Sequence, residues 1–219
     1  MKWIDSHKCL RDVPIERKTV YLGCHKTTAR KICSLQTNIK DNVKAILENY
    51  SKEQIKKASS IKAIFMDVDG VLTDGQIIYD EAGKELKNFH VRDGLIIAHL
   101  KRFGIITGII SGRESAAVSR RCAELGIDFC HQGILDKLSV AEKLARHYNL
   151  KMKEILYLGD DINDVAIFRK CGLSVCPSDT LSYVKDEVDL VSRYKGGKGV
   201  MREAADLVLA ARGFMEKLL

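Results

Sequence analysis

The sequence predicts an α/β fold in which a doubly wound parallel sheet carries helices on both faces. Two observations lead to this prediction. Short apolar runs alternate with longer helical patterns from residue 61 onwards, which is typical of a parallel sheet. Several of the apolar runs end in acidic or hydroxyl residues, and open α/β sheets place their sites at the carboxyl ends of their strands.

Length and composition set the limits of the prediction. The chain has 219 residues, which suits one domain of moderate size with an appendage. Its seven cysteines form no CxxC pair and no framework of the secreted type, so we expect reduced thiols and a cytoplasmic protein. We expect no membrane span, because no apolar run approaches the roughly 18 residues that a span requires.

The charge of the chain is unevenly distributed. Residues 1–60 hold 13 of the 36 basic and 6 of the 29 acidic side chains, which leaves 23 of each sign in residues 61–219. We therefore predict a boundary near residue 60, with a basic N-terminal extension (1–60) before the α/β domain (61–219). We interpret the extension as solvated and partly helical, with one helix over Asn42 to Ala58. Nucleic-acid binding by this basic arm is the alternative.

The predicted elements of the domain follow in order. A strand over Ile61 to Met66 leads into a β-hairpin, made of Gln76 to Asp80 and Glu85 to His90 around a glycine-containing turn. Helices and strands then alternate. We expect helices over 95–103, 114–125, 136–148 and 200–212, and one ending at 170. We expect strands over 104–110, 127–130, 155–158, 173–175 and 188–191.

Two aspartates follow the first strand directly. Asp67 and Asp69 stand at positions i and i+2, which project to the same side of an extended backbone. Two carboxylates this close repel one another unless a cation lies between them. The pattern therefore predicts a nucleophile, an acid/base and Mg²⁺. A surface turn is the alternative interpretation, because Asp and Gly dominate turns.

Polar groups at the other strand ends extend this site. Ser111 follows the next long strand, Asp160 and Asp161 follow a later one, and Lys137 opens a helix. Carboxylates suit a hard divalent cation, whereas a hydroxyl, backbone N–H groups and a lysine bind phosphate oxygens. One carboxylate can attack phosphorus while a second serves as acid and then base. The set predicts phosphoryl transfer.

These residues resemble the four motifs of the haloacid dehalogenase superfamily of phosphatases, and residues 61–213 are similar to its 3-deoxy-D-manno-octulosonate 8-phosphate phosphatase family. The superfamily motifs are matched by Asp67-Val68-Asp69-Gly70-Val71, Ser111, Lys137 and Gly159-Asp160-Asp161-Ile162-Asn163-Asp164. The closer resemblance rests on five segments, Asp67 to Gly75, Phe89 to Gly94, Ile110 to Arg113, Gly159 to Asp161 and Gly196 to Glu203.

The resemblance implies a Rossmann-like core with a hairpin flap and no cap domain. The spacing of the motifs agrees. A hairpin and a helix fill the gap between Asp69 and Ser111, a helix and a strand fill the gap between Ser111 and Lys137, and neither gap holds a separate cap domain. The resemblance also implies Mg²⁺-dependent hydrolysis of a sugar-acid phosphate through an aspartyl-phosphate, a place in lipopolysaccharide biosynthesis, and a homotetramer. In that tetramer one subunit's flap and tail help to close a neighbour's site.

The resemblance further implies a role for each site residue. Asp67 is the nucleophile and Asp69 the acid/base, and both bind the metal with Asp160, Asp69 through its backbone carbonyl. Phosphate contacts fall to Ser111, Gly112 and Lys137, and the orienting groups are Asp161 and Asp164. Substrate contacts fall to His90, Val91, Arg92, Asp93, Gly94, Arg113 and Arg121.

Some features leave alternatives open. Arg113 and Arg121 are eight residues apart, so we expect them on nearly the same helix face, where they bind a sugar carboxylate or are exposed charges. Ala98 stands where the resemblance leads us to expect a basic substrate contact, so the identity of the sugar acid stays open. A nine-carbon, sialic acid-type sugar-acid 9-phosphate is the alternative substrate. A non-catalytic assembly module of the same fold is a further alternative. We expect Gly196 to Gly199 to be flexible and to carry Lys198 outward towards a phosphate or carboxylate.

Overall fold

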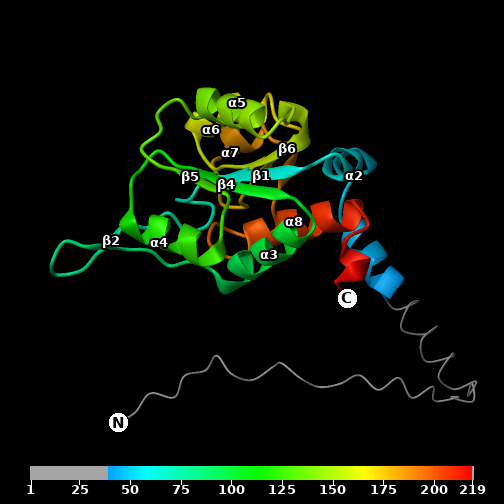
Figure 1. The fold of residues 1–219 in the computed structure, drawn as a ribbon, viewed down its shortest axis with the longest axis horizontal. Helices are drawn as coiled ribbons and strands as arrows, with labels where there is room; N and C mark the ends of the chain where they lie inside the picture. The colour runs from blue at the N-terminus through cyan, green and yellow to red at the C-terminus, as the bar shows by residue number, and fades with distance from the viewer. Residues whose placement is uncertain (1–38, 219) are drawn as a thin grey trace, which may run out of the picture. The chain divides into compact units, whose positions relative to one another are not determined.

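Six parallel strands form the centre of the computed structural model, which describes residues 39–218 (Figure 1). Their order across the sheet is β5-β4-β1-β6-β7-β8. The strands are β1 (Ala63–Met66), β4 (Ile106–Ile110), β5 (Phe129–His131), β6 (Ile155–Leu158), β7 (Leu173–Cys176) and β8 (Leu190–Val191). The predicted doubly wound parallel sheet is confirmed, and most strand bounds differ from the prediction by one or two residues.

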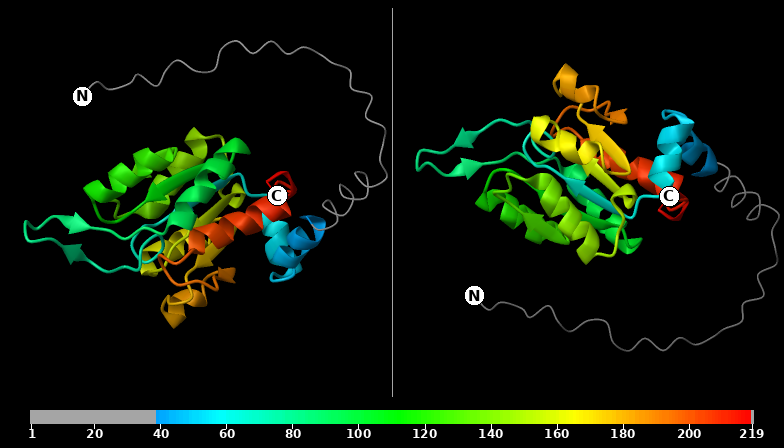
Figure 2. Two further views of the ribbon diagram at one scale, coloured as in Figure 1. Left: turned by 90° about the horizontal axis from the view of Figure 1, so that it is seen from below. Right: turned by 90° about the horizontal axis from the view of Figure 1, so that it is seen from above.

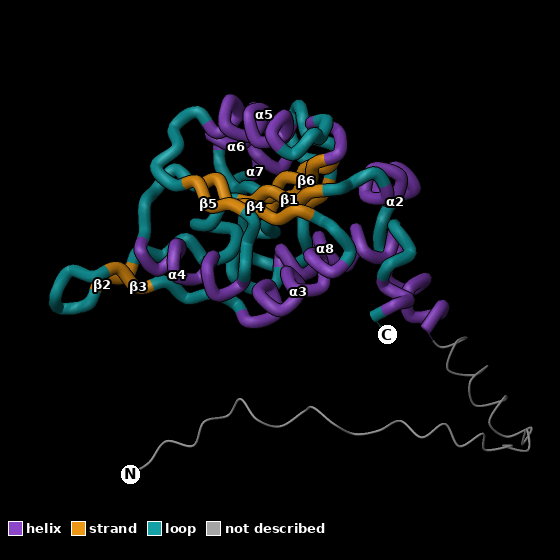
Figure 3. The backbone as a smooth tube through the Cα atoms, in the orientation of Figure 1, coloured by secondary structure: helices purple, strands orange, loops and turns teal. Residues whose placement is uncertain are grey.

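Helices cover both faces of this sheet (Figures 1 and 3). One face carries α3 (Val91–Arg102), α4 (Ala116–Leu125) and α8 (Val200–Ala211), and the other carries α5 (Lys137–His147), α6 (Ile162–Phe168) and α7 (Ser182–Lys185). Within residues 39–218 there are also two short 3₁₀ turns, η1 (Met152–Glu154) and η2 (Met215–Lys217). Each face has its own apolar core, with the sheet between the two.

The register of the central strands fixes where the chain leaves the sheet. β1 is apolar throughout and fully buried, because helices cover it on both sides. Its last residue, Met66, pairs with Ile109 of β4 and with Leu158 of β6. All three strands run in the same direction, so the residues that follow them emerge side by side at one edge.

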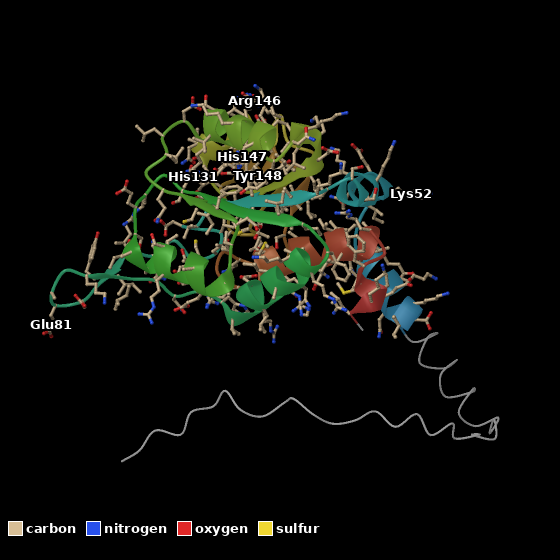
Figure 4. The ribbon with its side chains drawn as sticks, in the orientation of Figure 1. Lys52, Glu81, His131, Arg146, His147 and Tyr148 are labelled. Atoms are coloured by element: carbon tan, nitrogen blue, oxygen red, sulfur yellow. The ribbon has the colours of Figure 1, made fainter. Side chains whose placement is uncertain are left out.

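The hairpin consists of β2 (Ile78–Tyr79) and β3 (Glu85–Leu86), which pair antiparallel over fewer residues than predicted. It extends away from the sheet in the views of Figures 1 and 2, and Figure 4 shows Glu81 at its tip. Asp80 closes the turn, because its Oδ1 accepts hydrogen bonds from the backbone N–H groups of Ala82 and Lys84 at 3.0 and 2.8 Å.

Residues 39–59 form two helices, so the expected single helix over Asn42 to Ala58 is wrong. The first covers residues 39–47, and the second is α2 (Lys52–Ser59). Ser51 starts the second helix through a capping box: its Oγ accepts from the Gln54 N–H at 3.2 Å, and the Gln54 side chain accepts from the Ser51 N–H at 2.9 Å.

These two helices pack on the α/β core. Val43 and Ala58 are buried in the same apolar cluster as α8, and Figure 2 shows α2 beside α8. Lys57 forms an ion pair with Asp189 at 2.5 Å, and Gln54 donates to the Asp189 carbonyl. The compact unit therefore begins at Ile39, twenty-two residues before the boundary expected from charge. Residues 1–38 of the predicted extension lie outside the described residues.

The described C-terminal residues fold back on their own chain. Phe214 stacks on Phe103 at 4.6 Å, and Arg212 donates to the carbonyl of Ile61, just before β1. The C-terminal residues 212–218 therefore lie at the amino ends of the strands, on the opposite edge of the sheet from the carboxyl ends that carry Asp67 and Asp69. Among the described residues, no helix is long and apolar enough to cross a membrane.

Candidate active site

A cavity of about 310 Å³ lies at the carboxyl ends of the three central strands. Asp67 and Asp69 reach it from β1, Ser111 and Gly112 from β4, and Asp160 from β6. It is lined in addition by Gly70, Gly75, Arg113, Asp161 and Asn163. The structure thus brings together most of the residues for which the sequence predicts phosphoryl chemistry.

Asp67 is held in one orientation by hydrogen bonds to both of its carboxylate oxygens. Its Oδ1 accepts from the Val68 N–H at 2.7 Å, and its Oδ2 accepts from the Lys137 ammonium at 2.5 Å. The residue is only 7% exposed, and burial raises its pKa to about 6 even though Lys137 opposes the shift. A fixed carboxylate at the bottom of an open cavity is placed to act as a nucleophile.

Lys137 begins α5 and lies between two carboxylates. Its side chain is fully buried and contacts Asp67 at 2.5 Å and Asp164 at 2.8 Å. Burial favours the neutral amine, but the two carboxylates outweigh it and raise the pKa of Lys137. Lys137 is therefore a buried member of the site, although it lies in the first turn of a helix.

Asp160 completes a cluster of three acidic side chains. One carboxylate oxygen from each of Asp67, Asp160 and Asp164 lies within 4.8 Å of the others. Burial raises the pKa of Asp160 to about 8, and the charges of Asp67 and Asp164 add to the shift. A divalent cation relieves this repulsion, and carboxylate oxygens are the ligands that Mg²⁺ prefers. The donor set therefore fits magnesium.

Gly70 is required by the approach of Asp160. A Cβ at position 70 would lie 1.9 Å from the Asp160 Oδ2, and the backbone φ of +82° disfavours other residues. The glycine after the two aspartates that follow β1 is thus part of the site and not only a turn residue.

Asp164 positions its neighbours. It is fully buried, and its Oδ1 accepts from Lys137 and from the Tyr157 hydroxyl, each at 2.8 Å. Its Oδ2 accepts from the N–H groups of Asp160 and Asp161 at 3.0 and 3.3 Å. Asp161 instead caps α6, where its Oδ1 accepts from the Ile162 N–H. Asp164 therefore links Lys137 to the loop that carries Asp160.

A ring of four charges, formed by Asp69, Lys87, Glu85 and Arg113, connects the hairpin to the cavity. Lys87 lies 2.5 Å from the Asp69 Oδ1 and 3.3 Å from Glu85. Glu85 lies 2.7 Å from Arg113, whose Nε is 3.9 Å from the Asp69 Oδ2. Sequence reasoning missed Glu85 and Lys87, since no motif contains them. The sequence nevertheless contained one indication, because Glu85 and Lys87 are two residues apart in a predicted strand and so project from the same face of it.

The predicted substrate contacts after the hairpin lie elsewhere. His90, Asp93, Gly94 and Arg121 line a separate cavity of about 20 Å³, beneath α3 and α4. His90 Nδ1 and Asp93 Oδ2 are buried there and have no hydrogen-bond partner among the described residues. Val91 is exposed, and Arg92 lines a third cavity, next to Lys198 and Tyr194. Within one chain, none of these residues lines the cavity that contains Asp67.

The two arginines do not share a helix face, and that expectation is wrong. α4 begins at Ala116, so Arg113 lies in the turn before it, whereas Arg121 lies within the helix. Arg121 packs over Phe89 with 6.0 Å between the guanidinium and the ring centre. The two guanidinium groups consequently line different cavities.

Gly196 and Gly197 pack inward, which differs from the flexible segment expected. The N–H of Gly197 donates to the carbonyl of Val71 at 2.9 Å, and a Cβ on Gly196 would lie 2.0 Å from the carbonyl oxygen of Gly70. Both glycines are buried, because they permit close approach to the loop after β1. Lys198 is exposed and lines the third cavity, apart from Asp67.

Comparisons with known proteins agree with this geometry. Residues 127–203 match the family model for haloacid dehalogenase-like hydrolases. The chain is 42% identical over 158 residues to the 3-deoxy-D-manno-octulosonate 8-phosphate phosphatase of Haemophilus influenzae, covering 72% of this chain and 88% of the relative.

Solved structures give the same result. The corresponding phosphatase from Yersinia pestis matches with a TM-score of 0.75 and 36% identity, over 76% of this chain and 90% of that one. The enzyme from Moraxella catarrhalis, solved in complex with a magnesium ion, a phosphate ion and a KDO molecule, matches with a TM-score of 0.75 and 38% identity, over 77% and 97%.

The fold and site therefore define a phosphatase of the haloacid dehalogenase-like hydrolases. Within that class, the chain belongs to the 3-deoxy-D-manno-octulosonate 8-phosphate phosphatase family.

Proposed function

We propose that this phosphatase hydrolyses 3-deoxy-D-manno-octulosonate 8-phosphate to the free sugar acid and phosphate, with Mg²⁺ as cofactor. The observation that carries the proposal is the acidic cluster of Asp67, Asp160 and Asp164 at the cavity, in which the Lys137 ammonium contacts Asp67 and Asp164. The Moraxella catarrhalis relative, with magnesium, phosphate and sugar acid bound, supports it.

The proposed magnesium ligands are the carboxylates of Asp67 and Asp160 and the backbone carbonyl of Asp69. Asp164 is left out, because four hydrogen-bond donors already occupy its two oxygens. When bound, the ion neutralises charge on the acidic cluster and on the transferring phosphate.

Catalysis would proceed in two half-reactions. Asp67 attacks phosphorus, the bond from phosphorus to the sugar oxygen breaks, and Asp69 gives its proton to that oxygen. Asp69 then takes a proton from a water whose oxygen attacks phosphorus, and the bond from the Asp67 carboxylate oxygen to phosphorus breaks to release phosphate. Ser111, the Gly112 N–H and Lys137 would hold the transferring oxygens. Asp161 and Asp164 would orient these groups.

Substrate recognition would be shared between subunits. Arg113 lines the catalytic cavity, where its guanidinium suits the sugar carboxylate. The other proposed contacts line other cavities or the surface of the same chain. We propose that these residues, namely His90, Val91, Arg92, Asp93, Gly94 and Arg121, contribute to substrate binding once a neighbouring subunit's flap and tail close the site.

The proposed assembly is a homotetramer built around the hairpins. Ile77, Ile78, Tyr79 and Leu86 are 53%, 43%, 61% and 46% exposed, although a two-stranded hairpin is marginally stable unless it packs on something. Closed homo-oligomers bury such faces by symmetry. Light scattering coupled to gel filtration would test the assembly, and Ile78→Asp should lower both the mass and the activity. A fully active wild-type monomer would refute it.

The wider setting is also part of the proposal, namely a role in lipopolysaccharide biosynthesis in the cytoplasm. We propose further that residues 61–219 are the phosphatase domain and that residues 1–60 precede it, with the helices of residues 39–59 packed on that domain. Within the described residues, the thiols of Cys122, Cys130, Cys171 and Cys176 are free, which is in keeping with a reducing compartment.

A substrate panel tests the proposal. Phosphate release is measured with Mg²⁺ from the eight-carbon 8-phosphate, a nine-carbon sialic acid-type 9-phosphate and glycerol 2-phosphate. We expect the highest kcat/KM for the eight-carbon compound. A higher value for the nine-carbon compound would transfer the assignment to that substrate. Absence of activity on every phosphate would favour a non-catalytic assembly module of the same fold.

A further inference from the structure

Lys87 occupies an unusual position for a residue of an exposed hairpin. Its side chain is only 1% exposed, whereas Leu86 next to it is 46% exposed. An ammonium group loses hydration on burial and needs charged partners in return. Its partners are Asp69 at 2.5 Å and Glu85 at 3.3 Å. The hairpin therefore carries a buried cation to the side chain assigned above as the acid/base.

The contact distinguishes the two oxygens of Asp69. Oδ1 faces the Lys87 ammonium and also lies 3.4 Å from the Thr73 hydroxyl. Oδ2 lies 3.9 Å from the Nε of Arg113, beyond hydrogen-bond distance, and Arg113 lines the catalytic cavity. Among the described residues, Oδ1 is thus held by the hairpin while Oδ2 accepts no hydrogen bond, and Asp69 lines the catalytic cavity.

The chemistry of an ammonium group gives this asymmetry a consequence. Lysine has three donors and no acceptor, so it can bind only a lone pair of Oδ1. Oδ2, which has no such partner, is therefore the oxygen available to exchange a proton with the leaving oxygen of a substrate in the cavity.

We propose that Lys87 is a positioning residue that holds Asp69 with Oδ2 towards the leaving oxygen, and that Glu85 holds Lys87 in turn. The inference rests on the proposed function. In the step concerned, the proton moves from Oδ2 to the substrate oxygen as the bond from phosphorus to that oxygen breaks. The electron pair of the broken bond stays on the oxygen, and Asp69 is left as the carboxylate.

The test uses leaving groups that differ in their need for a proton. Glycerol 2-phosphate and the eight-carbon substrate release an alkoxide that must be protonated, whereas p-nitrophenyl phosphate releases a stable phenolate. Single-turnover experiments with excess full-length enzyme isolate the first half-reaction. We expect Lys87→Met to slow release of the alkyl alcohols by roughly 100-fold, the lower end of acid catalysis, and release of p-nitrophenolate by less than about threefold.

Two further variants serve as controls. Lys84→Met changes an exposed lysine in the turn of the same hairpin and should leave both rates within about twofold of wild type. Lys87→Arg keeps the donor and should recover at least about a tenth of the wild-type alkyl rate. In an Asp69→Asn background, Lys87→Met should slow the release of the alkyl alcohols by less than about a further threefold, because the two residues act as one unit.

Equal slowing of both leaving groups would overturn the proposal, since a loss of hairpin structure or of binding affects them alike. An unchanged alkyl rate in Lys87→Met, or no recovery in Lys87→Arg with the fold intact by circular dichroism, would also overturn it. If wild-type enzyme cleaves p-nitrophenyl phosphate and glycerol 2-phosphate but not the eight-carbon compound, the substrate assignment fails while the Lys87 proposal is still decided.

Discussion

The acidic cluster makes a specific prediction about stability and pH in the absence of metal. Unfolded aspartate loses its proton near pH 4, whereas burial and mutual repulsion hold the folded pKa of Asp67 at about 6 and that of Asp160 at about 8. From about pH 4 to about pH 8, the folded state therefore binds more protons than the unfolded state. The stability of the metal-free protein should therefore fall as the pH rises.

The size of the effect follows from the two pKa values. From pH 5 to pH 8, the linkage relation gives a loss of about 4 kcal/mol from Asp160 and about 1 kcal/mol from Asp67. Mg²⁺ binds the ionised carboxylates, so its stabilising effect should increase over the same range.

Urea unfolding in EDTA at pH 5, 6, 7 and 8, at one protein concentration, measures this loss, and parallel titrations with Mg²⁺ measure the recovery. Asp160→Asn is the control, because it removes the group responsible for most of the slope. A stability that is constant or rises from pH 5 to 8, together with equal stabilisation by Mg²⁺ at both ends, would refute the reasoning.

Three further predictions follow from the same geometry. Asp67→Asn should keep the fold by circular dichroism but reduce turnover below about one hundredth of wild type, because an amide cannot form the acyl-phosphate; a higher residual rate would exclude Asp67 as nucleophile. EDTA should stop activity and Mg²⁺ should restore it, so activity that persists in EDTA would contradict the metal site. Gly70→Ala should weaken Mg²⁺ binding at least about tenfold by calorimetry, because its Cβ would lie 1.9 Å from Asp160 Oδ2. Gly104→Ala has a similar positive φ but open space around the Cβ, so it should lose stability while keeping metal affinity, and an equal loss of affinity would show that backbone strain alone is responsible.

The alternation of strands and helices was predictable because it depends on local periodicity. The strand at 155–158 has the predicted bounds, and the carboxyl ends of parallel strands necessarily share one edge. Asp67, Ser111 and Asp160 could therefore be brought together from sequence alone. The split of the N-terminal helix was also a local effect, and the Ser51 and Gln54 capping pair is visible in the sequence.

Contacts that depend on tertiary packing were not predictable. The pairing of Lys87 with Asp69 requires the path of the hairpin, which no local pattern fixes. The separation of Arg113 from Arg121 depends on the helix starting at Ala116, and helix starts are among the least certain features of a sequence. The inward packing of Gly196 results from close approach to Gly70, although glycine-rich sequence is equally typical of flexible linkers.

The most direct test of the central claim is to trap the phosphoryl-enzyme. Enzyme, Mg²⁺ and 3-deoxy-D-manno-octulosonate 8-phosphate are mixed, quenched in acid within one turnover and analysed by peptide mass spectrometry. The proposed function predicts one phosphoryl group on the peptide that contains Asp67, and none in Asp67→Asn. Turnover of this substrate without a trapped phosphoryl group, or with the group on another residue, would contradict the proposed function.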